Sequence, residues 1–200
     1  MDLQWIDTEK AVSRFNAWGT GDRPFFFLTD YLHRRWLVEP IDGLSADELL
    51  YAFPGHCNAP DEEAKARPLV WQPHPLTPEA YHEKFEIVHR NMLAGNSYLA
   101  NLTCRIPLDT NLSLRDIFLL SHARYRLWVK DAFVCFSPES FVRIRDGVIS
   151  SYPMKGTISC SVPNALQTLL GDVKEAAEHA TIVDLIRNDL SKVAEKVTVR

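Results

Sequence analysis

The segment from residue 172 to residue 190 limits the possible folds more than any other part of the chain, because it combines a helical pattern with a nearly complete apolar surface. Asp172 is placed to cap the first turn, since its carboxylate can accept hydrogen bonds from the free amides there. The helical period is followed by Ala176, Ala180, Val183, Ile186 and Leu190. Ile182 and Leu185 widen this stripe until the middle of the helix is apolar nearly all round, which predicts that this part is buried.

The same helix is predicted to begin with two carboxylates on one face. Glu175 and Glu178 are three residues apart, so their side chains lie one turn from each other and repel unless a cation or water screens them. One interpretation is a solvated acidic first turn in which Lys174 pairs with Glu178. The other is part of a Mg²⁺ site, because Mg²⁺ takes oxygen ligands and often uses one or two carboxylates. Taken alone, the pair favours the solvated turn.

Composition and charge exclude several classes of protein. The 200 residues fit one domain or part of a larger one, and 46% hydrophobic residues are enough for a core. The net charge of −4 argues against nucleic acid and anionic membrane as partners. No apolar run reaches membrane-spanning length, and the N-terminus does not have the pattern of a signal peptide. The four cysteines form no CxxC pair, which favours reduced thiols in a cytoplasmic protein.

The rest of the chain alternates predicted helices with short predicted strands. Asp146 and Gly147 tolerate the positive φ angles of a type I′ turn, so they predict a hairpin in which Ile144 faces Ile149. A loop rich in proline and charge is expected over residues 54–67. Helices are expected over residues 8–17, from Ser45 onward, over 77–95 and over 114–120, and strands over 24–30, 36–39, 96–106, 132–136 and 196–199.

The longest recognisable motif is KEAAEHATIVDLIRNDLSKV, which covers residues 174–193. It closely resembles the KExxEHxMxVDLxRNDL signature of the chorismate-utilising enzymes, the family of anthranilate synthase and aminodeoxychorismate synthase. This resemblance implies that Glu175 and Glu178 help to hold the Mg²⁺ that binds the carboxylate of chorismate. It also implies an α+β fold, with a two-sheet antiparallel β core flanked by helices.

A second motif, PMKGT at residues 153–157, is similar to the family's PxxGT segment. Taken alone, Lys155 is a surface lysine. In the family, the residues at the positions of Gly156 and Thr157 approach the substrate, since glycine allows close backbone approach and threonine offers a hydroxyl and an amide. Aminodeoxychorismate synthases commonly have lysine at the position of Lys155, where anthranilate synthases have alanine. The resemblance therefore implies that Lys155 is a nucleophile, because a desolvated amine can form a covalent adduct.

Four further features bear on the resemblance to this family. Leu99 stands where isochorismate and salicylate synthases carry a lysine that activates water, and an aliphatic side chain cannot act as a base. The SPE sequence at residues 137–139 resembles a family motif that borders the active site, although Glu139 fits the role of a turn carboxylate equally well. Neither of the family's tryptophan-binding motifs is recognisable, so we expect no inhibition by tryptophan. The arginine that often follows the GT pair is also missing from residues 158–160.

Within the family, these residues most resemble component I of aminodeoxychorismate synthase. The resemblance implies conversion of chorismate and ammonia to 4-amino-4-deoxychorismate, toward p-aminobenzoate and folate, with ammonia supplied by a glutamine amidotransferase subunit. The alternatives are anthranilate synthase component I and a non-catalytic fragment of the same fold. Residues 1–75 match the family poorly, and residues 76–200 match the first part of its catalytic region. Because the family's later motifs are missing, we expect residues 1–200 alone to be inactive.

Overall fold

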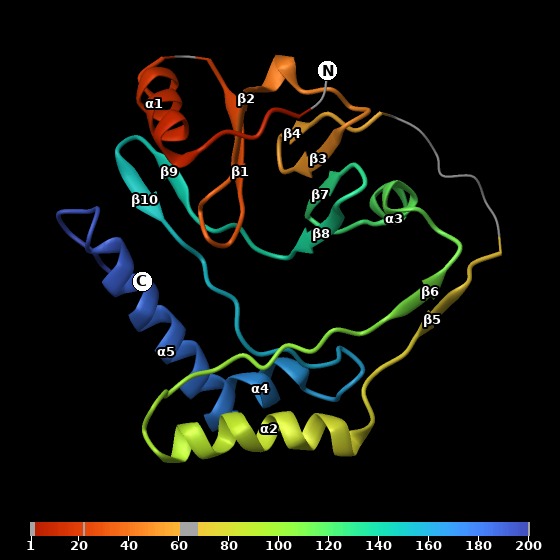
Figure 1. Cartoon of the computed structure of the whole chain (residues 1–200). Coiled ribbons are helices and arrows are strands. Elements are labelled where there is room, and N and C mark those ends of the chain that lie inside the picture. Colours follow the sequence, from red (N-terminus) through yellow and green to blue (C-terminus); the bar gives the residue numbers. More distant parts are fainter. Residues whose placement is uncertain (1–2, 22, 61–67, 200) are drawn as a thin grey trace. The chain divides into compact units, whose positions relative to one another are not determined.

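The computed structural model describes residues 3–21, 23–60 and 68–199 (Figure 1). The chain divides into two compact units, Met1–Pro60 with Ser121–Arg200, and Asp61–Leu120. Helices and strands are mixed, and every recorded strand pair is antiparallel, which confirms the predicted fold class.

The helices and strands are labelled in chain order. The helices are α1 (Thr8–Gly19), the 3₁₀ helix η1 (Ile41–Gly43), α2 (Pro78–Leu93), α3 (Leu114–Leu120), α4 (Ala165–Leu170) and α5 (Val173–Leu190). The strands are β1 (Phe25–Thr29), β2 (Trp36–Pro40), β3 (Leu49–Phe53), β4 (His56–Cys57), β5 (Trp71–Pro73), β6 (Leu108–Thr110), β7 (Tyr125–Val129), β8 (Phe133–Ser137), β9 (Arg143–Arg145) and β10 (Val148–Ser150). No helix in the described part of the chain is both long enough and apolar enough to cross a membrane.

The first unit begins with a helix packed on a hairpin. Asp7 caps α1 by accepting a hydrogen bond from the backbone amide of Lys10 at 2.9 Å. The strands expected over residues 24–30 and 36–39 are confirmed as β1 and β2, and they pair with each other as an antiparallel hairpin. The Phe15 ring of α1 meets the Phe27 ring of β1 edge to face, with centroids 5.3 Å apart.

The core of this unit lies between the β1–β2 hairpin and a four-stranded sheet of order β4-β3-β7-β8. In the central pair of that sheet, Leu49 lies opposite Val129 and Tyr51 lies opposite Leu127. Alternate side chains of a strand point to the same face, so these four residues present one apolar surface to the hairpin. The buried cluster consists of Phe26, Leu37, Leu49, Tyr51, Leu127 and Val129.

The strand β4 covers only two residues of β3, and beyond it the side chain of Asn58 forms hydrogen bonds with the backbone of β3. Its side-chain oxygen accepts a hydrogen bond from the backbone amide of Tyr51 at 2.7 Å, and its side-chain nitrogen donates to the carbonyl of Leu49 at 2.8 Å. An asparagine side chain carries the same donor and acceptor as a peptide group. It can therefore take the place of a further strand residue and satisfy two polar groups of a buried strand.

The second hairpin matches its prediction closely. Asp146 and Gly147 have φ angles of 51° and 73°, as a type I′ turn requires. Ile144 of β9 lies opposite Ile149 of β10. The two polar turn residues therefore set the register of this pair of strands.

Two predicted helices are confirmed in the second unit. Thr77 caps α2 by accepting from the amide of Ala80 at 3.2 Å, and Gly95 has a φ of 75° just after the helix ends. The helix α3 spans the predicted residues.

The helix expected from Ser45 onward is wrong. The amides of Glu48 and Leu49 both donate to the carbonyl of Ser45 at 3.0 Å, which makes a single turn, and β3 then begins at Leu49. The run of apolar residues in β3 pairs with β7, and this sheet contact overrides the local capping signal. The loop expected over residues 54–67 contains the short strand β4, and its residues 61–67 lie outside the described part of the chain.

Two predicted strands are also wrong. Residues 96–106 and 196–199 have no strand in the structure, and β6 begins only at residue 108. A strand needs a partner for its backbone groups, and no recorded strand pair among the described residues involves either segment.

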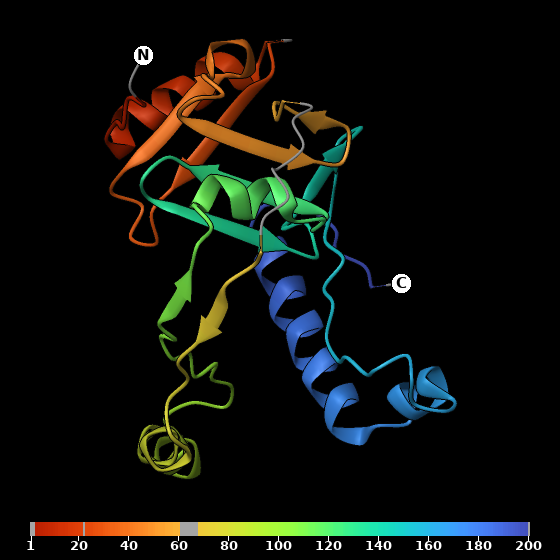
Figure 2. The same cartoon turned by 90° about the vertical axis from the view of Figure 1, so that its right-hand side faces the viewer.

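The burial predicted for α5 is wrong as well. The helix has the expected span and cap, but none of its described residues is buried, and Leu185 is 49% exposed. Figure 2 shows α4 and α5, the two blue helices, joined by a short turn. In the described part of the chain no second layer covers the apolar stripe of α5, so these side chains stay partly in solvent.

We expect Asn58→Ala to lower the free energy of unfolding by about 2 kcal/mol, because the Tyr51 amide and the Leu49 carbonyl would lose their partner. Urea unfolding followed by circular dichroism measures this change. The matched control is Asn16→Ala, at an exposed position of α1, which should change stability by no more than about 0.5 kcal/mol. Equal stability of the two variants would show that Asn58 does not support the sheet.

Candidate functional site

The candidate site lies at the first turn of α5, where three charged side chains meet. The Lys174 ammonium lies 3.0 Å from Oε1 of Glu175 and 3.0 Å from Oε1 of Glu178. The carboxylates are the more enclosed partners, with side chains 25% and 40% exposed, whereas the lysine side chain is 71% exposed. The two residues predicted to hold a metal therefore converge on one cation in the structure.

Glu175 is turned away from the role that its position in the helix would favour. Asp172 caps the helix by accepting from the Glu175 amide at 3.0 Å. In a capping box, the glutamate at this position would in turn accept from the backbone amide of the cap residue. Here the Asp172 amide donates to the carbonyl of Leu169 at 3.2 Å instead. The Glu175 carboxylate is directed toward Lys174 and toward the segment that contains Gly156.

Gly156 packs directly against Glu175. Its φ is +79°, and a Cβ added there would lie 3.0 Å from Cδ1 of Leu169 and 3.2 Å from Oε2 of Glu175. Only glycine adopts this backbone conformation without strain and also leaves room for the carboxylate. The structure thus brings together two elements that the sequence predicted separately, the PMKGT segment and the acidic turn of α5.

Lys155 and Thr157 flank this contact on both sides. Both side chains are exposed, and neither has a hydrogen bond or ion pair with another described residue. The desolvation expected for a nucleophilic lysine is therefore not provided by the described residues. Lys155 nevertheless directly precedes Gly156, which packs against Glu175.

Glu139 anchors the PMKGT segment, a role that the sequence left open. Its Oε2 accepts a hydrogen bond from the Met154 backbone amide at 2.6 Å. Ser137 holds the turn in which Glu139 lies, since its hydroxyl donates to the Glu139 carbonyl at 2.8 Å. The SPE motif was the signal that could have suggested this contact, because it places a carboxylate just after a strand.

The electrostatics of the acidic turn favour a bound cation. Hydrogen bonds to Glu178 and Glu175 raise the pKa of Lys174 to about 12, so the ammonium is charged at neutral pH. Two carboxylates that already hold a cation fit part of a Mg²⁺ shell, which needs hard oxygen donors. Within the described ranges no group of three or more acidic, histidine or cysteine residues forms a metal cluster, so the pair would need further ligands.

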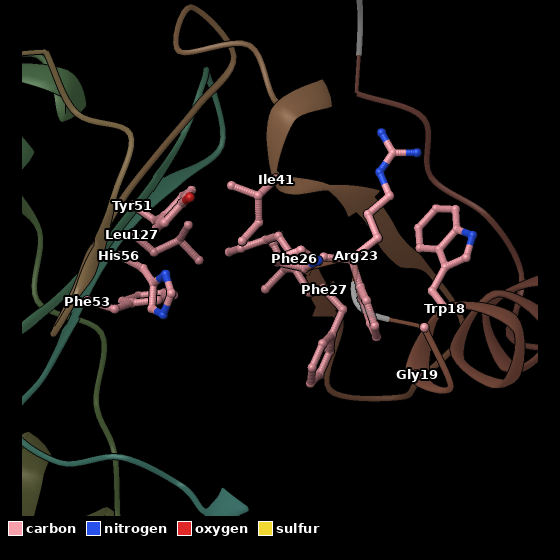
Figure 3. A pocket seen from close by; sticks show the side chains of 14 residues that line it. Trp18, Gly19, Arg23, Phe26, Phe27, Ile41, Tyr51, Phe53, His56 and Leu127 are labelled. Atoms are coloured by element: carbon pink, nitrogen blue, oxygen red, sulfur yellow. The ribbon is translucent and has the colours of Figure 1, made fainter. Parts of the chain in front are cut away.

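Two cavities lie elsewhere in the first unit. A groove of about 1070 Å³ is bordered by residues of β10, α5 and the segment after α5, including His179 and Arg187. A pocket of about 620 Å³ lies between the β1–β2 hairpin and the sheet (Figure 3). In Figure 3, Phe26 and Ile41 border this pocket from the hairpin side, and Tyr51 and Leu127 border it from the sheet side. The rings of Phe26 and Tyr51 stack with centroids 5.6 Å apart, so the two sides are in contact there. None of the predicted site residues lines either cavity.

The sequence is similar to a described protein family and to several named proteins. The family described as "chorismate binding enzyme" matches residues 40–200. An uncharacterised PabA-like protein of Haemophilus influenzae is 42% identical over 94% of this chain and 57% of its own length. Aminodeoxychorismate synthase component 1 of Klebsiella aerogenes is 32% identical over 62% of this chain and 30% of its own length. Anthranilate synthase component 1 of Leptospira biflexa is 31% identical over 62% of this chain and 30% of its own length.

The chain is shorter than these relatives. It spans 57% and 58% of the two PabA-like proteins that it matches over nearly its whole length. No solved structure matches the chain.

We expect Gly147→Ala to lower the free energy of unfolding by about 1 kcal/mol, because its φ is positive. Gly156→Ala should lower it by more, because its φ is also positive and its Cβ would meet neighbouring atoms. Only the alanine at position 156 would also displace Leu169 and Glu175, since nothing lies within 4 Å of a Cβ at position 147. Urea unfolding measures stability, and methyl NMR of Leu169 reports the displacement. An unchanged Leu169 signal in Gly156→Ala would contradict the packing described.

Proposed function

The chain belongs to the chorismate-binding enzyme family, and from this premise we propose that it forms part of an aminodeoxychorismate synthase, which aminates chorismate at C4. One observation carries this proposal: Gly156 packs against Glu175, so the segment with Lys155 and the carboxylate pair of α5 meet in one place. Relatives that share only 31–32% identity include both aminodeoxychorismate and anthranilate synthases. Lys155 favours the first of these activities.

In the proposed reaction, the amine of Lys155 acts as the nucleophile. Its nitrogen forms a bond to C2 of chorismate, the ring double bonds shift, and the C4 hydroxyl leaves as water with a proton from the amine. Ammonia then forms a bond to C4, the double bonds shift back, and the bond between C2 and Lys155 breaks. A proton passes from the new amino group to the departing lysine nitrogen, which restores the free amine.

The remaining site residues would bind and orient the substrate. Glu175 and Glu178 would hold Mg²⁺. When bound, the ion would bind the substrate carboxylate and assist loss of the C4 hydroxyl. The absence of a side chain at Gly156 would allow the ring to approach the backbone, and Thr157 would offer its hydroxyl. Glu139 would keep Lys155 in place through its hydrogen bond to Met154.

A second protein component would supply the ammonia. The names of the Klebsiella and Leptospira relatives describe each as component 1 of a synthase, which supports a partner subunit. We propose a glutamine amidotransferase for this role. At neutral pH most ammonia is protonated to ammonium, which cannot act as a nucleophile, and an amidotransferase would deliver unprotonated ammonia directly to C4.

We expect Lys155→Ala to reduce formation of aminodeoxychorismate at least a hundredfold, because the covalent route is lost. The assay uses the longest chain that the gene encodes, with chorismate, ammonium and Mg²⁺, and separates products by chromatography. Intact-mass analysis of the unsubstituted enzyme should find an adduct equal to chorismate less one water. Lys84→Ala, which removes an exposed lysine from α2, is the matched control and should keep full activity.

Three outcomes would contradict parts of this proposal. Undiminished amination by Lys155→Ala would refute the lysine as nucleophile. Anthranilate as the product would assign the other activity of the family. Absence of any chorismate-dependent product would favour a non-catalytic member of the fold.

A further inference from the structure

Lys174 occupies a position that is unfavourable for a cation in an ordinary helix. It is the second residue of α5, after the Asp172 cap, where the positive end of the helix dipole lies. Its pairing with Glu178 also runs in the weaker direction, because a glutamate placed before a lysine is the better order. Helix stability alone therefore does not explain a lysine at this position.

The contacts of Lys174 explain its position better. The two carboxylates are one turn apart on the same face and would repel each other. The ammonium lies 3.0 Å from an oxygen of each, so it offsets one of the two negative charges and reduces the repulsion between them. Glu175 accepts this contact in place of the capping-box bond that its position favours.

We propose that Lys174 is a built-in counter-ion of this carboxylate pair, which keeps the two side chains converged without a divalent cation and competes with the cation for the same oxygen atoms. This inference rests on the proposed function, in which Glu175 and Glu178 are metal ligands. A divalent cation must displace the ammonium before it can use those oxygens.

Displacement of the lysine is structurally simple. The side chain is 71% exposed, and among the residues that the structure describes its polar contacts are those to the two carboxylates. The ammonium can therefore swing into solvent without breaking another interaction. The incoming cation would then take over the bridging of the two carboxylates, and Glu175 would remain against Gly156.

The test uses the longest chain that the gene encodes, so that any further ligands are present. It measures binding of Mn²⁺, which prefers oxygen ligands as Mg²⁺ does, by the loss of its free EPR signal. We expect Lys174→Gln to bind Mn²⁺ about three- to tenfold more tightly than the unsubstituted chain, because two exposed ion pairs no longer compete. Lys192→Gln is the matched control: it removes the same charge near the other end of α5, where Lys192 pairs with Asp189 at 2.8 Å. That variant should bind as the unsubstituted chain does, within about twofold.

Additional variants separate the competing explanations. Glu178→Gln, introduced into Lys174→Gln, should weaken Mn²⁺ binding at least about tenfold, and circular dichroism verifies that each variant keeps its helices. Equal affinity of Lys174→Gln and the unsubstituted chain, with a loss on Glu178→Gln, would overturn the counter-ion role and leave the ligand assignment standing. Absence of Mn²⁺ binding in Lys174→Gln, or no effect of Glu178→Gln, would overturn the ligand assignment and the counter-ion role together.

Discussion

The pairing of β3 with β7 is the interaction on which the first unit depends. It joins Leu49–Phe53 to Tyr125–Val129, two strands that are separated in the sequence by all the residues of the second unit. At the end of this pairing, two hydrogen bonds join Glu48 and Lys130, which are 82 residues apart. The Lys130 amide donates to the Glu48 carbonyl at 2.9 Å, and the ammonium donates to the Glu48 carboxylate at 2.8 Å. Without this closure the hairpin β1–β2 would have no apolar sheet surface to cover, and the buried cluster would not form.

The candidate site is built from segments without regular structure that lie against a regular helix. Its carboxylates are positioned by the capped first turn of α5, which is local and robust. The PMKGT segment has no strand or helix of its own, and its position is set by the Glu139 contact at one end and the Gly156 contact at the other. The site therefore combines a helix that carries the charges with an irregular segment that is held by two contacts.

The sequence predicted those features that depend on neighbouring residues. The cap of α5, the helix expected over residues 77–95, the turn at Asp146 and Gly147, and the span of α3 all follow from local chemistry, and the structure confirms them. The wrong predictions concern partners that are distant in the sequence. Alternation at residues 96–106 indicates a strand but cannot supply a second one, and the apolar surface of α5 cannot by itself bring a covering layer.

The same limit applies to the site. The helical spacing predicted that Lys174 would contact Glu178, but not that it would hold Glu175 as well. That second contact depends on Glu175 turning from its capping role toward Gly156, which is 19 residues earlier in the sequence. The roles of Lys155, Gly156, Thr157, Glu175 and Glu178 in chemistry stay predictions, since they come from motif resemblance and await the experiments described.

Asn58 has a consequence beyond the stability of the sheet. Exposed strand edges offer open amide and carbonyl groups to other chains and are common starting points for aggregation. On β3, the Tyr51 amide and the Leu49 carbonyl are already occupied by a side chain of the same molecule. Beyond the short cover of β4, a strand from a neighbouring molecule would find these two hydrogen-bonding positions of β3 taken and could use them only by displacing Asn58.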